Sequence, residues 1–345
     1  MSAAIPTMTM NLIQKKKRIG VVKTDNHGLI YAYCLGKADR YEFLQAGGQL
    51  YILENEWSPV IPLRDSEITG CWSKTGMKGI SPACTEENFA RAFNCKIYDT
   101  LEEMADPDLF DGILVGNCGG YGEDHLELCM PFIKKGIPIF IDKPFAINAT
   151  DAAALLNAAR EYNCPVFSSS ILLYDICNKK LLTKNYGKCS FVVSTFKSPM
   201  ESRNASVHTL SALLGAVRFS NGDDYKINFI EHIGTEKNEI YRLEFNDGTV
   251  GIMNMEGFGT YAFHVQVYAE RGISSEYTTE PTLRTGIIDI AAEFLHMIDT
   301  RKPPLAYDRI FEFVATIDAG LRSKTEHRAV TLQEIADEAG WIFGE

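Results

Sequence analysis

The chain has 345 residues, 46% of them hydrophobic, which is enough for two domains with separate cores. Its net charge of −11, from 34 Lys and Arg against 45 Asp and Glu, argues against nonspecific binding to nucleic acid or an anionic membrane. The nine cysteines form no Cys-x-x-Cys pair and no apolar run reaches membrane-spanning length, so we expect a cytoplasmic protein with reduced thiols and no metal. Residues 1–16 are expected to form a flexible tail.

The turn after the first predicted strand, Arg18–Val22, has the spacing of a dinucleotide-binding fingerprint but lacks most of its glycines. Such a fingerprint has glycine at the first, third and sixth positions, which here hold Lys23, Asp25 and Gly28. Asp25 would add a carboxylate where the diphosphate approaches the backbone. Two like charges ~4 Å apart repel by about 4 kcal/mol at an effective dielectric constant of 20.

A second interpretation of this turn keeps the cofactor. Asp25 or Asn26 would cap the helix that is expected from Leu29 onward, and would use the donors that a phosphate otherwise takes. The cofactor would then lie further out and be held by Lys23, His27 or water. The sequence leaves both interpretations open.

The second predicted strand, Glu67–Trp72, ends at the position that usually contacts the adenosine ribose. An acidic residue there favours NAD, whereas a small polar residue with a cation favours the 2′-phosphate of NADP. Ser73, Lys74 and Thr75 follow the strand, so NADP is slightly favoured over NAD. The long connection before this strand is interpreted as an insertion, with a helix near Tyr41–Gln45 and a short strand at Gln49–Leu53.

The stretch Asp111–Ala146 organises the predicted first domain as strand, glycine-rich loop, helix and strand. A helix between two short apolar runs predicts a parallel strand pair with a right-handed crossover. Ligands bind beyond the carboxyl ends of parallel strands, so Asn117 and Lys143 are expected to face one crevice.

One segment of this stretch resembles a known family. Asp142-Lys143-Pro144, preceded by His125 and Ile137–Ile141, is similar to the Glu-Lys-Pro segment of the glucose–fructose oxidoreductase / inositol dehydrogenase / MocA (Gfo/Idh/MocA) family. The resemblance runs from about Lys17 to the C-terminus. It implies an α/β fold with an N-terminal Rossmann doubly wound parallel sheet, followed by an α+β domain with an open, mainly antiparallel sheet.

The second half of the chain has the pattern of that sheet. Ile240–Phe245 alternates with a period of two, and Asn246-Asp247-Gly248 is a hairpin turn. We expect a dinucleotide-binding domain over residues 17–170 and a substrate-binding and oligomerisation domain over residues 171–345. The other expected elements here are strands at Phe191–Phe196, Lys226–Ile233, Val250–Met255 and Phe263–Ala269, and helices at Thr285–Ile298 and Arg309–Arg322.

Two residues are the principal catalytic candidates. Lys143 ends a buried strand before a proline, and partial burial can lower the pKa of its ammonium group towards a useful range. The resemblance implies that it positions substrate and relays a proton, and that Pro144 is cis. His208 lies four residues after Asn204 in a segment like the family's Asp-x-x-x-His, so both could share a helix face. Asparagine replaces the family's aspartate.

The remaining candidates are expected to line the site. His125 would organise the loop after the fourth strand or touch the cofactor, and Cys118 would line that loop. Arg203 and Tyr174 are expected to touch substrate. The predicted cofactor-binding residues are Asn26, His27, Gly28, Ser73, Lys74, Asn117, Cys118, His125 and Lys143; the predicted substrate-binding residues are Lys143, Tyr174, Arg203, Asn204 and His208, of which Lys143, Asn204 and His208 are expected to be catalytic.

The first hypothesis for function is a nicotinamide-dependent oxidoreductase that acts on a secondary alcohol of a sugar, cyclitol or related polyol, as a homodimer or homotetramer. An alternative is an NAD-using lyase or glycosidase that oxidises its substrate transiently. A third is a non-catalytic ligand-binding protein that has lost the cofactor site, as the missing glycines and Asp25 would allow.

Overall fold

The computed structural model describes residues 15–48, 63, 65–74, 76–77, 81–174, 186–235, 237–256, 263–277 and 280–344, except for the side chains of residues 280–284. The strand expected at Gln49–Leu53, the residue Thr75 and most of the expected tail lie outside these ranges.

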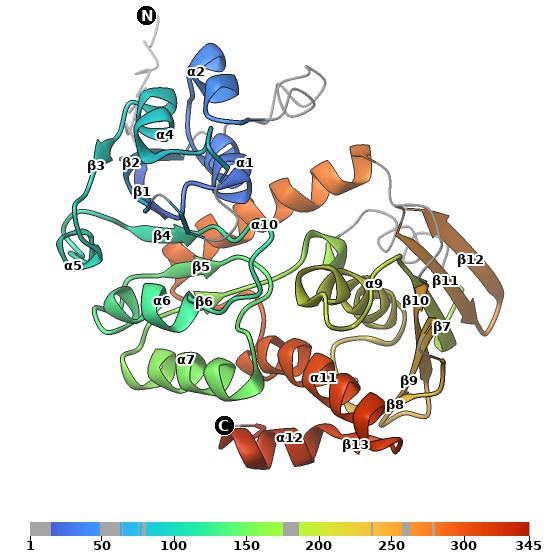
Figure 1. Ribbon diagram of the computed structural model, residues 1–345. Helices are drawn as coiled ribbons and strands as arrows, with labels where there is room; N and C mark the ends of the chain where they lie inside the picture. Colours follow the sequence, from blue (N-terminus) through green and yellow to red (C-terminus); the bar gives the residue numbers. More distant parts are fainter. Residues whose placement is uncertain are drawn as a thin grey trace, which may run out of the picture.

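The first sheet has six parallel strands in the order β3-β2-β1-β4-β5-β6, which is the doubly wound Rossmann order (Figure 1). Its central strands are fully buried because helices cover both faces. The strands are β1 (Lys17–Val22), β2 (Ser66–Trp72), β3 (Lys96–Ile97), β4 (Gly112–Val115), β5 (Ile139–Ile141) and β6 (Val166–Phe167).

Side-chain caps fix where the helices around this sheet begin. Asp25 caps α1, which therefore starts at Asn26 rather than near Leu29. Thr85 caps α4 through the N–H of Asn88, and Asn148 caps α7 through the N–H of Asp151. These helices are α1 (Asn26–Leu35), α2 (Arg40–Gln45), α4 (Glu86–Phe93), α5 (Leu101–Met104), α6 (His125–Ile133) and α7 (Ala149–Glu161), followed by the 3-10 turn η1 (Ile171–Leu173).

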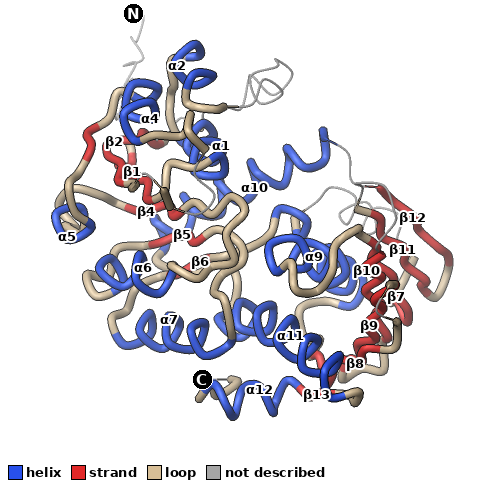
Figure 2. Tube along the Cα trace, in the orientation of Figure 1, coloured by secondary structure: helices blue, strands red, loops and turns tan. Residues whose placement is uncertain are grey.

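The second sheet has seven strands in the order β12-β11-β7-β10-β9-β8-β13 (Figure 2). Only β7 and β10 pair in parallel, and the other neighbours are antiparallel. Tyr241, Leu243 and Phe245 of β9 point to the buried face, as the period-two pattern predicts. The strands are β7 (Cys189–Thr195), β8 (Ile227–His232), β9 (Asn238–Phe245), β10 (Val250–Glu256), β11 (His264–Ala269), β12 (Gly272–Tyr277) and β13 (Val330–Thr331).

Four long helices connect the two sheets. The helix α9 packs on β7 and β10, while α10 contacts α1 and brings Phe294 within 6.1 Å of Phe140 in β5. The helix α11 contacts α7 on one side and β8 on the other (Figure 1). These helices are α9 (Arg203–Asn221), α10 (Glu280–Thr300), α11 (Tyr307–Glu326) and α12 (Leu332–Ala339). Among the described residues, no helix combines the length and apolarity needed to cross a bilayer.

Candidate active site

Lys143 follows Asp142 at the carboxyl end of β5. Ligands of open parallel sheets bind beyond this end of the strands. The peptide bond between Lys143 and Pro144 is cis. The lysine is only 6% exposed, and its Nζ donates to the backbone oxygen of Asn204 at 3.2 Å, in the first turn of α9. Burial lowers the pKa of the Lys143 ammonium group, although the Asp142 carboxylate opposes that shift.

His208 lies in the second turn of α9, and a serine holds its ring. The Nδ1 atom of His208 is 2.6 Å from Oγ of Ser170, and the ring meets Phe263 edge to face with 5.4 Å between centroids. Burial holds the pKa of His208 well below its usual value, and the neighbouring positive charges of Lys143 and His27 lower it further. The imidazole is therefore neutral at pH 7 and can accept a proton there.

One cavity joins these two side chains. It has a volume of about 90 Å³, with Lys143, His208, His27 and Asp142 as its polar lining. The rest of its lining is largely apolar and consists of Ile30, Tyr31, Ile171 and Ile287. An engineered cavity of about 150 Å³ takes up benzene. The cavity here is smaller, so its walls must part to admit a pyridine ring and a substrate.

An ion pair forms the floor of the cavity. His27 Nδ1 lies 2.5 Å from Oδ2 of Asp142, whose side chain is 1% exposed. Burial alone would lower the pKa of His27, but the Asp142 carboxylate outweighs it and raises the pKa to about 10. Burial likewise acts to raise the pKa of Asp142, and His27 reverses this and lowers it. The other oxygen of Asp142, Oδ1, is buried without a partner among the described residues and can accept a ligand's hydroxyl.

Replacing His27 with glutamine is expected to lower the free energy of unfolding by about 3 kcal/mol at pH 6, because the Asp142 carboxylate would remain buried without its cation. The raised pKa of His27 stabilises the fold fully below about pH 6.5 and loses its effect as the pH rises through about 10. The difference between wild type and variant should therefore shrink between pH 7 and pH 10 in urea titrations.

The matched control is the double variant with His27→Gln and Asp142→Asn, which removes both charges. It should be more stable than His27→Gln alone, since no unpaired charge remains buried. A His27→Gln variant as stable as wild type at pH 6 would show that the pair contributes nothing to the fold.

The Asp25 carboxylate occupies the N-terminus of α1. It is fully buried, and it accepts from the backbone N–H of Gly28 at 2.9 Å and from that of Cys118 at 2.6 Å. Burial raises the pKa of Asp25, although the charge of His27 and these two N–H groups oppose the shift. This is the capping role that the sequence allowed, and it places a carboxylate where a Rossmann fold usually receives a diphosphate.

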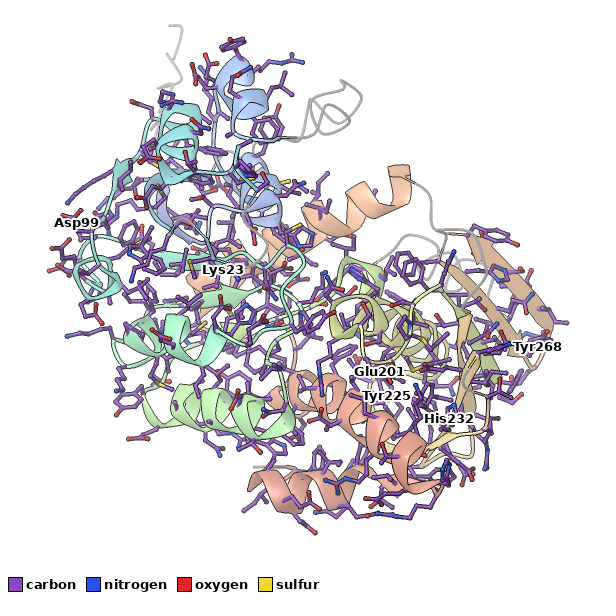
Figure 3. The ribbon with its side chains drawn as sticks, in the orientation of Figure 1. Lys23, Asp99, Glu201, Tyr225, His232 and Tyr268 are labelled. Carbon is purple, nitrogen blue, oxygen red and sulfur yellow. The ribbon has the colours of Figure 1, made fainter. Side chains whose placement is uncertain are left out.

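Lys23 does not reach out towards a ligand. Its side chain is 1% exposed, and Nζ donates to Asn117 Oδ1 at 3.2 Å and to Asp124 Oδ2 at 3.0 Å. Figure 3 shows this lysine within the part of the molecule that is built around the first sheet. The suggestion that Lys23 holds an outwardly shifted cofactor is therefore wrong, because its ammonium group is already paired inside the sheet.

The described residues suit the nicotinamide and adenosine ends of a dinucleotide. They differ from the usual Rossmann pattern at the position of the diphosphate. A second cavity of about 390 Å³ lies beyond β2, lined by the loop at Ser73 and by the start of α4. A helix leaves its first N–H groups without acceptors inside the helix, and Asp25 takes only that of Gly28. The N–H groups of Asn26 and His27 remain for a diphosphate lying outside Asp25.

The other predicted site residues serve mainly to hold the loops. His125 is buried and bonds through Nδ1 to the carbonyl of Phe145 at 2.9 Å, and Asn117 donates to the carbonyl of Lys143 at 3.4 Å. Asn204 was expected to act beside His208; its backbone oxygen accepts from Lys143, and the described partner of its side chain is Ser202. The residue that orients His208 is Ser170.

The two residues expected to touch substrate do not line the cavity that joins Lys143 and His208. Tyr174 is buried against Phe167, and burial raises the pKa of its hydroxyl. It does not line the cavity that holds His208. Arg203 forms an ion pair with Asp318 at 2.6 Å. Packing and pairing occupy these side chains in this conformation, although Arg203 lines another, smaller cavity beside Lys143, and substrate contact by either residue stays a prediction.

Three comparisons relate the chain to known proteins. Residues 64–170 match the model of the oxidoreductase family with an NAD-binding Rossmann fold. Trans-1,2-dihydrobenzene-1,2-diol dehydrogenase of Xenopus laevis is 30% identical over 120 residues, which are 33% of this chain and 35% of that protein. The match thus spans about a third of the length of that curated relative.

Solved structures share the fold at low sequence identity. The scyllo-inositol dehydrogenase of Lactobacillus casei, solved with NAD(H) and scyllo-inositol, is 11% identical with a TM-score of 0.67, and covers 92% of this chain and 100% of that one. A probable dehydrogenase from Thermotoga maritima is 16% identical with a TM-score of 0.68, over 92% and 99% of the two chains. The Rossmann sheet and the match over residues 64–170 thus make this part of the chain similar to the NAD-binding oxidoreductases of the Gfo/Idh/MocA family.

Proposed function

We propose that this protein is a nicotinamide-dependent oxidoreductase that transfers a hydride to or from a secondary alcohol of a cyclitol, sugar or related polyol. The observation that carries the proposal is the meeting of Lys143 and His208 in one cavity at the carboxyl end of β5. The family match supports the cofactor, and relatives that are named as inositol and dihydrobenzenediol dehydrogenases support the class of substrate.

The chemistry follows from the protonation states of these two side chains. A bound nicotinamide ring supplies or accepts the hydride. His208 takes the hydroxyl proton through Nε2, which requires the tautomer whose Nδ1–H donates to Ser170. Lys143 donates to the substrate oxygen and holds it against His208, while Asp142 Oδ1 can accept from a second hydroxyl.

The shape of the cavity narrows the class of substrate. Its lining divides into four polar side chains and a set formed by three isoleucines and Tyr31. A ring with two neighbouring hydroxyl groups on one edge and a less polar remainder matches this division better than a fully hydroxylated ring. The relative that acts on a dihydrobenzenediol is named for such a molecule.

The test is a panel assay with purified protein and either NAD or NADP, followed through absorbance of the reduced nicotinamide. The panel contains trans-1,2-cyclohexanediol, trans-1,2-dihydrobenzene-1,2-diol, myo-inositol, scyllo-inositol and glucose. Turnover of at least one vicinal diol, with the two less hydroxylated diols preferred, is expected. Binding of neither nucleotide in calorimetry, together with no turnover, would overturn the proposal.

A second candidate function rests on Asp25. A buried carboxylate at the start of α1 occupies the usual diphosphate position, as in a family member that binds a small ligand without a dinucleotide. In that case the cavity at Lys143 and His208 would bind a polyol without oxidising it. Calorimetry with NAD and with the same panel separates the two functions, because only the oxidoreductase requires the nucleotide.

A further inference from the structure

The carboxylate of Glu86 stands at the end of β2, although no acidic residue follows that strand in the sequence. Glu86 is the first residue of α4, and its Oε2 accepts from the backbone N–H of Ser73 at 3.1 Å. Ser73 is the first residue beyond Trp72, the last residue of β2. The side chain thus lies where the strand-end acid of an NAD-binding Rossmann fold would lie.

The same carboxylate faces a space large enough for part of a nucleotide. Glu86 lines the cavity of about 390 Å³ together with Ser73 and Lys74. The cavity lies beyond the carboxyl end of β2, which β1 and β4 separate from β5, the strand that leads to Lys143. An adenosine ribose in this space would have its hydroxyl groups within reach of a fixed acceptor.

The nearby charges oppose a 2′-phosphate. Lys74 was the cation that made NADP the slightly favoured cofactor, but its Nζ lies over the ring of Trp72, 5.3 Å from the ring centroid. Burial raises the pKa of Glu86, and the charges of Glu87 and Asp99 raise it further, so three acidic groups influence this end of the cavity. A phosphate dianion there would meet like charges, whereas a ribose hydroxyl would donate to Glu86.

We infer that Glu86 takes the role of the strand-end acid, accepts a hydrogen bond from the adenosine ribose, and makes the protein select NAD over NADP. This inference rests on the proposed function and names the nucleotide of that site. Sequence reasoning missed it because the acid is supplied by a helix 13 residues away along the chain rather than by the strand.

The experiment is isothermal calorimetry of the full chain with NAD and with NADP, for the wild type, Glu86→Gln and Glu87→Gln. Glutamine at position 86 keeps an oxygen for the N–H of Ser73 and removes the charge. The wild type is expected to bind NAD at least about tenfold more tightly than NADP, and Glu86→Gln to reduce that ratio to about threefold or less. Glu87→Gln removes a neighbouring charge but leaves the acceptor held by Ser73 in place, so it should change the ratio less than Glu86→Gln does.

The outcomes separate this inference from the proposed function. A wild type that binds NADP as tightly as NAD, or a Glu86→Gln variant with the wild-type ratio, would overturn the role of Glu86 while leaving the oxidoreductase intact. A wild type that binds neither nucleotide would overturn both. The nucleotide released from purified wild-type protein by heating, identified by mass spectrometry, gives an independent reading and should be NAD.

Discussion

Replacing Lys143 with methionine is expected to lower kcat/KM by about 10²–10⁴-fold on the best substrate of the diol panel. Methionine has nearly the length of lysine, but it cannot donate to a substrate oxygen or to the carbonyl of Asn204. The thermal midpoint should change little, because the variant removes a buried charge that burial already disfavours. Steady-state rates and a melting curve on the same preparation provide the measurement.

The control for this variant is Lys134→Met, which changes an exposed lysine at the end of α6 in the same way. It should keep wild-type kcat/KM. If Lys143→Met stayed within about threefold of wild type, the ammonium group would have no part in the reaction. A large fall in the melting temperature would instead give Lys143 a structural role.

Replacing Asp25 with glycine is expected to tighten NAD binding by at least about tenfold, with a ceiling set by the ~4 kcal/mol of repulsion between like charges at ~4 Å. The change removes the carboxylate from the start of α1 and frees the N–H groups of Gly28 and Cys118 for the diphosphate. The fold should lose only about 0.3 kcal/mol from the loss of the cap, since glycine is itself tolerated at a helix N-cap. Calorimetry and urea unfolding measure the two effects.

Two further variants separate the effect of the Asp25 charge on NAD binding from the effects of side-chain size and of helix capping. Asp25→Asn keeps a capping oxygen and removes the charge, so it should recover part of the gain in affinity. Asp39→Gly removes the cap of α2, where Asp39 accepts from the N–H groups of Tyr41 and Glu42, and should leave NAD affinity unchanged. Weaker NAD binding by Asp25→Gly would show that the carboxylate helps the cofactor rather than displaces it.

The sequence predicts the order of strands in this fold better than it predicts the partners of its polar side chains. The residues that predict a strand within Ile137–Ile141 and a hairpin turn at Asn246-Asp247-Gly248 all lie within those short segments. Both predictions are confirmed. The partner of His208 could not be found this way, because Ser170 lies 38 positions earlier and only the packing of α9 on η1 brings it near. The contact between Glu86 and Ser73 is missed for the same reason.

Some of the missed features did have a local signal. Thr331 and Glu334 form a capping box that marks the start of α12, although that helix was not predicted. Asn148 is another such signal, since asparagine is a favoured N-cap and its side chain accepts from the N–H of Asp151 at the start of α7. By contrast, β3 and β13 have two residues each, which is too short for any periodic pattern to reveal.

The boundary expected near residue 170 remains a prediction. The described residues show why a single boundary is hard to draw here: α10 follows the second sheet in the chain but packs against α1 and the face of β5. The walls of the cavity therefore come from both halves of the sequence, with Ile30 from the first and Ile287 from the second. Opening the cavity for a substrate would require α1 and α10 to separate.

The most direct test of the account is a crystal structure of the full chain grown with NADH. Its nicotinamide ring should lie between Nζ of Lys143 and the imidazole of His208, after the wall of isoleucines has moved outward. A ring bound elsewhere, or clear NADH density with Lys143 still bonded only to Asn204 and remote from the ring, would contradict the shared site on which the proposed reaction depends.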